Sequence, residues 1–251
     1  METTKLKRFA QFARRSLIEQ IGEKLTRVRA ADSQARREEP EAIAKLEARI
    51  KADGDDGSAA IEAAAYVWFN RFCALRFMDA NRYTRAGIVS PLPGQFQPEI
   101  LANAKQGDID ESIVSNDSLR AKIAALLSGK DPSDDPQAEA YRLLVVAACN
   151  HWHTAMPFLF EKIQDYTELL MPDDLLSGKS ILSYTREALT PAACEDVEAI
   201  GWLYQFYISE KKDLVFEGLK KNKKITPDNI PAATQLFTPH WIVRYLVENS
   251  L

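Results

Sequence analysis

The stretch AAAYVWFNRFCALRFM, residues 63–78, decides the fold class, because it is apolar around the whole circumference of a helix. It lacks the alternation of polar and apolar residues that a half-exposed strand would show. A helix that is apolar on all sides lies inside a core. We therefore expect a central buried helix that Ser58 caps and that runs to about Tyr83. Its Asn70, Arg71 and Arg76 must find partners or reach an edge, since unpaired buried polar groups are costly.

The sequence before this helix also has a helical period. Apolar residues recur at steps of three and four within residues 1–30, which predicts an amphipathic helix: Leu6, Phe9, Ala13, Leu17, Ile21, Leu25 and Val28. Residues 31–57 are mostly charged and small, with a short stripe at Ile43, Leu46 and Ile50. We interpret residues 31–57 as a solvent-facing helix and loop.

The sequence after residue 83 continues in helices. It predicts an irregular connection, two helices separated by a turn, and one long helix: residues 84–117, 118–128, 136–164 and 190–212. Pro157 is expected to bend or end the second of these helices, and Thr190-Pro191 to open the long one. A polar linker at 220–233 ends the helical part. Because no strand pattern stands out, we predict an all-α, irregular multi-helix domain over residues 1–230.

Composition limits the classes of protein to which the chain can belong. Its 251 residues are 46% apolar and 27% charged, as in a globular protein, and no stretch is apolar enough to span a membrane. Three widely spaced cysteines and the absence of a secretory signal favour a reducing cytoplasm. The net charge of −4 means that any nucleic-acid binding must come from local basic patches.

The last stretch, TQLFTPHWIVRYLVENSL at residues 234–251, predicts a further amphipathic helix. Thr238 suits the N-cap and Pro239 the first helical position, and Ile242, Val243, Leu246 and Val247 form a stripe that we expect to be buried. The backbone N–H groups of His240 and Trp241 would then point out of a helix end that favours an anion. The same Thr-Pro pair also occurs at 190–191 and 226–227, where it needs no ligand.

Two blocks of sequence resemble a known family. AYVWFNRFCALRFMDANRY at 65–83 and IGWLYQFYISEKKDLVFEGLKKNKKITPDNIPAATQLFTPHWIVRYLVENSL at 200–251 are similar to the PglX-type adenine-N6 DNA methyltransferases of bacterial phage-exclusion (BREX) systems. The resemblance implies an enzyme that modifies host DNA in bacteriophage defence, with S-adenosylmethionine as methyl donor. It also implies that residues 231–251 begin a Rossmann-like methyltransferase domain that is otherwise absent.

The resemblance implies cofactor-binding residues at the terminal helix. Phe237, Thr238 and Pro239 would line the methionine end of S-adenosylmethionine. The sequence contains neither the glycine-rich turn after a strand nor the Asn/Asp-Pro-Pro-aromatic loop that such an enzyme needs for its cofactor and its flipped adenine. We therefore expect no catalytic residue within these 251 and neither activity nor tight cofactor binding from this stretch alone.

Two further clusters carry chemistry. Lys220, Lys221, Lys223 and Lys224 lie in the polar linker and could contact phosphates of double-stranded DNA, although a solvated loop is the simpler interpretation. CNHWH at 149–153 offers too few ligands for zinc, so no metal is expected. Other phage-defence proteins are possible partners. The alternative is a self-contained helical module that binds protein or DNA and has no enzymatic activity.

Overall fold

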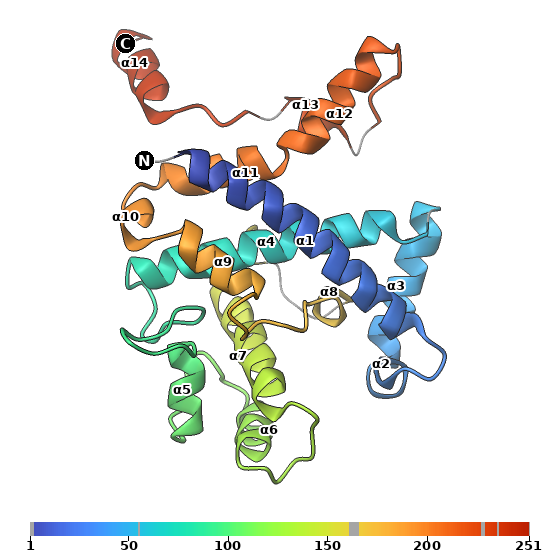
Figure 1. The fold of residues 1–251 in the computed structure, drawn as a ribbon, viewed down its shortest axis with the longest axis vertical. Helices are drawn as coiled ribbons and strands as arrows, with labels where there is room; N and C mark the ends of the chain where they lie inside the picture. The colour runs from blue at the N-terminus through green and yellow to red at the C-terminus, as the bar shows by residue number, and fades with distance from the viewer. Residues whose placement is uncertain (1–2, 55, 161–165, 227–228, 235, 251) are drawn as a thin grey trace.

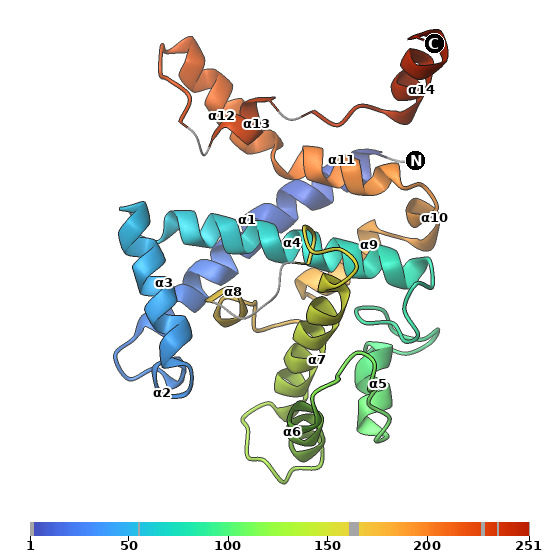
Figure 2. The same cartoon turned by 180° about the vertical axis from the view of Figure 1, so that it is seen from behind.

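The chain folds entirely into helices. A computed structural model describes residues 3–54, 56–160, 166–226, 229–234 and 236–250, and these ranges contain fourteen helices and no β-strand (Figures 1 and 2). One isolated antiparallel bridge joins Pro91 to Pro98. The all-α prediction is confirmed, and none of the described helices is long and apolar enough to cross a membrane.

The helices differ widely in length. Those before residue 160 are α1 (Thr3–Arg29), α2 (Gln34–Glu38), α3 (Pro40–Asp53), α4 (Ser58–Ala80), α5 (Glu99–Lys105), α6 (Asp117–Leu127) and α7 (Pro136–His153). Those after it are α8 (Tyr166–Leu169), α9 (Ile181–Ala188), α10 (Pro191–Cys194), α11 (Glu198–Tyr207), α12 (Ser209–Lys220), α13 (Ile230–Thr234) and α14 (His240–Ser250).

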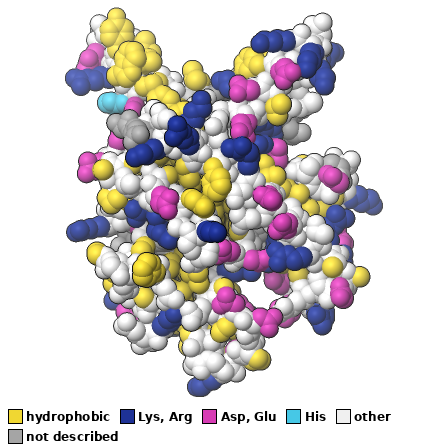
Figure 3. Space-filling model, in the orientation of Figure 1, with side chains coloured by type: hydrophobic (Ala, Val, Ile, Leu, Met, Phe, Trp, Pro, Cys, Tyr) yellow, Lys and Arg dark blue, Asp and Glu magenta, His cyan; other side chains and the backbone are white. Residues whose placement is uncertain are grey.

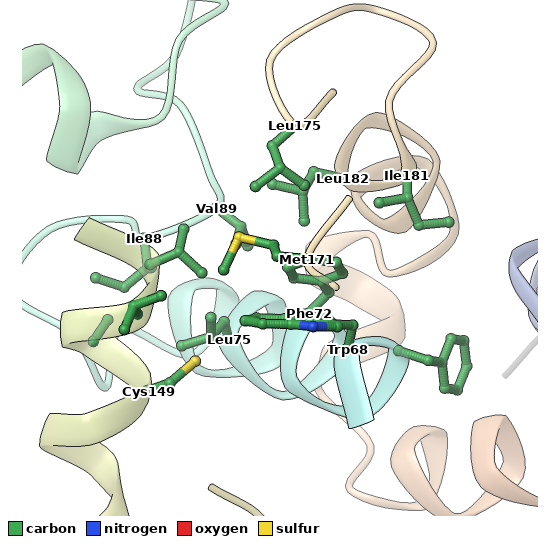
Figure 4. Packing of buried hydrophobic residues seen from close by; sticks show 14 of the residues in the cluster. Trp68, Phe72, Leu75, Ile88, Val89, Cys149, Met171, Leu175, Ile181 and Leu182 are labelled. Atoms are coloured by element: carbon green, nitrogen blue, oxygen red, sulfur yellow. The ribbon is translucent and has the colours of Figure 1, made fainter. Parts of the chain in front are cut away.

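Helix α4 forms the centre of the molecule, as its apolar circumference predicts. Helix α1 crosses it and also contacts α9 and α11, while α3 contacts α4 near its N-terminal end (Figure 1). All seven residues of the predicted α1 stripe are buried. In the close view, Trp68 and Phe72 of α4 lie between Met171 on one side and Cys149 of α7 on the other (Figure 4). The two rings are stacked with centroids 5.4 Å apart.

Arg76 of α4 finds its polar partners in distant segments, while Arg71 contacts a ring of its own helix. Arg76 donates from Nε to the Leu189 carbonyl at 2.9 Å and from Nη1 to the Ser90 hydroxyl at 2.8 Å. Arg71 is buried, and its guanidinium lies over the Trp68 ring, 5.1 Å from the centroid. The start of α4 differs from the prediction, because Gly57 precedes the helix and Ser58 is its first residue.

The predicted irregular connection at 84–117 contains the short helix α5 and is tied to the end of α4. The Asp79 carboxylate accepts the backbone N–H groups of Ile88, Val89 and Ser90 at 2.9 to 3.0 Å, and the Thr84 hydroxyl at 3.0 Å. Burial raises the pKa of this carboxyl, and its donors oppose that shift. A single side chain therefore orders a loop that the sequence only marks as irregular.

Three expectations about helix extent are wrong. Residues 31–57 are not a purely solvent-facing segment, because α3 buries Ile43, Leu46 and Ile50 in the core. The helix predicted at 136–164 is shorter: α7 ends at His153, ahead of Pro157, whose missing N–H and ring disfavour continuation as expected. Predicted residues 161–164 lie outside the described part of the chain. The long helix predicted at 190–212 is divided into α10, α11 and α12. Thr190 does cap α10 by accepting from the Ala193 N–H at 3.2 Å, while the Asp196 carboxylate accepts from the Glu198 N–H at 2.9 Å and begins α11 separately.

Two arms extend from the same side of the helical body. Helix α11 leads into α12, which contacts α13, and α14 follows on the other side (Figures 1 and 2). In the space-filling view the surface is hollowed between these arms; hydrophobic side chains gather on the α14 arm and Lys and Arg on the α12 arm (Figure 3).

An ion-pair network joins the far end of α1 to α7. The Asp173 carboxylate accepts from Lys24 and Arg27 of α1, and from Arg142 Nη1 of α7 at 3.4 Å. Burial alone would raise the pKa of Asp173, but the hydrogen bonds and charges of Lys24 and Arg27 outweigh it and hold the pKa below its usual value. The unfolded chain therefore takes up a proton first on acidification, so this contribution is complete above pH ~4 and is lost as the pH falls through the lowered pKa.

We expect Asp173→Asn to be less stable than the wild type at pH 7 by about 1 kcal/mol, a modest value because the carboxylate is partly exposed. The variant should also lose less stability between pH ~5 and ~2, since an amide does not titrate there. Urea unfolding followed by circular dichroism measures both effects, with the exposed Asp213→Asn as control. Equal acid sensitivity of Asp173→Asn and the wild type would contradict the assignment.

Candidate functional site

The candidate site begins with one face of α11. Glu198, Gly201, Trp202 and Gln205 are spaced by three, four and seven residues, so they share this face. Opposite them runs the segment that leads into α14 and contains the predicted cofactor residues. The structure thus brings those residues against a helix to which no pattern in the sequence assigns a role in the site.

Phe237 lies closely against this face. A Cβ atom built on Gly201 would lie 2.1 Å from Cε2 and 2.2 Å from Cδ2 of the Phe237 ring, so only glycine allows the ring to lie there. The Trp202 ring contacts Phe237 edge to face, with centroids 5.2 Å apart. The backbone N–H of Phe237 donates to Oε1 of Gln205 at 2.9 Å.

The turn that follows differs in detail from the prediction. Thr238 is exposed and Pro239 is half-buried, and α14 begins one residue later than expected, at His240. The Pro239 carbonyl accepts the N–H groups of Ile242 at 3.0 Å and Val243 at 3.3 Å. The N–H of His240, expected to be open to an anion, instead donates to the Glu198 carboxylate.

Helix α14 presents its apolar residues to solvent. None of its described residues is buried, and the Trp241 side chain is 70% exposed. The prediction of a buried stripe at Ile242, Val243, Leu246 and Val247 is therefore wrong within this chain, because no described element covers them; Ile242 alone is half-buried. Contiguous exposed apolar residues of this kind mark a surface that another part or molecule covers.

The four predicted DNA-contacting lysines all lie at the tip of the α12 arm. Lys220 ends α12, and the turn after it closes on the Gly218 carbonyl, which accepts the N–H groups of Lys221 and Lys223 at 3.0 Å. All four lysines are exposed, and Lys221 pairs with Glu217 at 2.7 Å. The turn places the four lysine side chains closer together than an extended linker would.

A cavity of about 670 Å³ lies at the base of the α12 arm. Glu62 of α4 accepts from Arg14 of α1 at 3.0 Å and from Lys211 of α12 at 2.9 Å. The rings of Tyr66, Tyr204 and Tyr207 also line the cavity. Tyr207 is buried and Tyr204 is half-buried. Burial raises the pKa of both hydroxyls, so they stay protonated near neutral pH.

The CNHWH stretch ends α7, and of its five residues only Cys149 is buried in the core, while His151 is exposed. Cys149 is buried, and burial raises the pKa of its thiol to about 12, so it stays protonated at neutral pH. Nδ1 of His153 lies 2.8 Å from the Phe160 carbonyl. In the described part of the chain, no three His, Cys, Asp or Glu residues are grouped as metal ligands would be.

Comparison with known proteins gives two related methyltransferases. The chain is 36% identical over 274 residues to the adenine-specific methyltransferase BrxX of Escherichia coli O9:H4 (strain HS), which covers 100% of this chain and 22% of that protein. It is 38% identical over 241 residues to the adenine-specific methyltransferase PglX of Lacticaseibacillus casei (strain Zhang), which covers 93% of this chain and 19% of that protein.

The resemblance to PglX-type methyltransferases is confirmed by these relatives. The chain spans about a fifth of the length of the curated relatives that it matches. No family model matches the chain.

Proposed function

We propose that this chain is the N-terminal helical region of a site-specific adenine-N6 DNA methyltransferase that modifies host DNA in bacteriophage defence. The observation that carries the proposal is its relation, along the whole chain, to two adenine-specific methyltransferases. The helical body then braces a catalytic domain formed by residues outside these 251. Such an enzyme acts on chromosomal DNA in the cytoplasm, with other phage-defence proteins as further partners.

The proposed methyl donor is S-adenosylmethionine, which supplies the methyl group for transfer to the adenine amino nitrogen. Phe237, Thr238 and Pro239 would form the wall beside its methionine end. The support within this chain is that Thr238 is exposed beside the start of α14. The His240 N–H at that helix end already donates to the Glu198 carboxylate, so it does not contribute to the proposed site. This chain supplies only that one wall, because the adenosine part needs residues of the catalytic domain.

The exposed face of α14 supports the same proposal. In a complete methyltransferase domain, helix α14 would be covered by the sheet and helices that follow it in such a fold. The alternative, a self-contained helical module whose last helix packs on its own core, is less well supported, because α14 buries none of its described residues. We therefore propose the domain boundary near residue 230, between the helical body and the start of the catalytic domain.

We expect cofactor binding to require more than these 251 residues. Isothermal titration calorimetry should show weak or no binding of S-adenosylmethionine to this chain. The longer polypeptide encoded by the same reading frame should bind it and form N6-methyladenine in duplex DNA, measured by mass spectrometry of digested nucleosides. In that polypeptide Phe237→Ala should raise the Kd for S-adenosylmethionine roughly tenfold, the effect of about 1.4 kcal/mol of lost contact.

Two outcomes count against this proposal. If the longer polypeptide forms no N6-methyladenine with S-adenosylmethionine present, the proposed activity is wrong. If the 251-residue chain binds S-adenosylmethionine tightly, the cofactor site does not depend on a separate catalytic domain.

Lys220, Lys221, Lys223 and Lys224 are proposed to bind DNA phosphates. Each phosphate that they neutralise contributes about 0.9 to the slope of log Kd against log salt concentration. Replacing all four with Ala should weaken duplex binding by the longer polypeptide and reduce that slope by up to about 3.6, with little change in sequence preference. Fluorescence anisotropy over a salt series measures both quantities.

The matched control removes four exposed lysines elsewhere on the helical body and so changes the net charge equally: Lys45, Lys51, Lys130 and Lys179. If both quadruple variants lose the same salt dependence, the effect is one of net charge. In that case the α12 arm is not the DNA contact.

A further inference from the structure

Gly201 provides the first reason to assign α11 a part in the cofactor site. It sits in the interior of a helix, where glycine costs stability relative to alanine. Its missing side chain is what lets the Phe237 ring lie against the helix, because a Cβ would meet three ring atoms at 2.1 to 2.7 Å. Any larger residue must move the ring, and the Phe237-Thr238-Pro239 turn with it.

Two hydrogen bonds hold the ends of the same turn. Gln205 accepts the N–H of Phe237 at 2.9 Å, and Glu198 accepts the N–H of His240. Thr238 and Pro239 lie between these two fixed backbone amides. The acceptors are separated from their donors by 32 and 42 residues, so the bonds connect α11 to the turn rather than forming within it.

We propose that Glu198, Gly201 and Gln205 are positioning residues that hold the Phe237-Thr238-Pro239 turn for the methyl donor. This inference rests on the proposed function, in which the turn lines the cofactor. The contacts from α11 are the restraint, because α14 buries none of its described residues and so does little to fix the turn. A pre-formed wall lowers the cost of ordering the site when the cofactor binds.

The first test concerns the turn itself and needs no enzymatic activity. Gln205→Met keeps the length of the side chain but removes the acceptor, and Gln205→Glu keeps an acceptor oxygen. Amide hydrogen exchange on the 251-residue chain should be about tenfold faster at Phe237 in Gln205→Met and near the wild-type rate in Gln205→Glu. Unchanged exchange at Phe237 in Gln205→Met would overturn the positioning role.

The second test uses the longer polypeptide. Gly201→Ala should raise the KM for S-adenosylmethionine roughly 10- to 100-fold, as a small displacement of a binding group does, while kcat changes less. Gly22→Ala is the matched control, because Gly22 is also inside a helix and a Cβ there would make an ordinary contact of 3.7 Å with Ile61. Circular dichroism checks that each variant is folded, and Gln205→Met provides a second variant with the same expected rise in KM.

The two hypotheses fail in different ways. If the wild-type polypeptide methylates adenine but Gly201→Ala and Gln205→Met have its KM, α11 does not position the turn and the proposed function stands. If the wild-type polypeptide does not methylate adenine, the proposed function fails, and hydrogen exchange still decides whether α11 holds the turn.

Discussion

The fold depends on the need to cover α4 from every direction. A helix without a polar face is not stable on the surface, so other helices contact α4 from several sides: α1, α3, α9, α10 and α11. Its Trp68 and Phe72 are covered by Met171, which lies in a loop, and by Cys149 of α7 (Figure 4). Because α11 belongs to the cover of α4 and α1, its outward face is fixed in place, and that face holds Phe237.

Four carboxylates connect segments of the molecule through hydrogen bonds and ion pairs. Asp79 gathers three backbone amides and orders the loop after α4, and Asp173 joins α1 to α7. Glu62 joins α1 and α4 to the base of the α12 arm, while Glu198 joins α11 to the start of α14. Asp79 accepts from groups 5 to 11 residues further along the chain, whereas Asp173, Glu62 and Glu198 accept from groups that are distant in sequence.

Sequence patterns predicted the elements that burial specifies and missed those that individual side-chain hydrogen bonds specify. The α1 stripe and the apolar α4 follow from helical periodicity, which is a local property. The division of the 190–212 helix depends on the Asp196 side chain bonding to the Glu198 N–H, and apolar periodicity does not reveal such a bond. The stripe of α14 was predicted as buried because an amphipathic pattern indicates that the apolar face of the helix packs against another element. The pattern does not indicate whether that element belongs to the same chain.

The candidate site also has features that the sequence predicted and features that it did not. The Phe237-Thr238-Pro239 motif could be found from the resemblance, and its placement against Gly201 could not, because 36 residues separate Gly201 from Phe237 and no local pattern links them. A glycine inside an otherwise aromatic helix was the available signal. The tyrosine-lined cavity was missed for a related reason: Tyr204 and Tyr207 have the spacing of core residues, and only the surrounding helices determine that a space remains beside them.

The partners of α4 have a consequence for synthesis on the ribosome. Trp68 donates to the Thr167 carbonyl, Arg76 to that of Leu189 and Asn81 to that of Cys194, each at 2.9 to 3.0 Å and each about a hundred residues further along the chain. At 5 to 20 residues per second, the most apolar helix is synthesised roughly 5 to 20 seconds before these partners. During that interval the nascent chain contains its most apolar helix without these three hydrogen-bond partners.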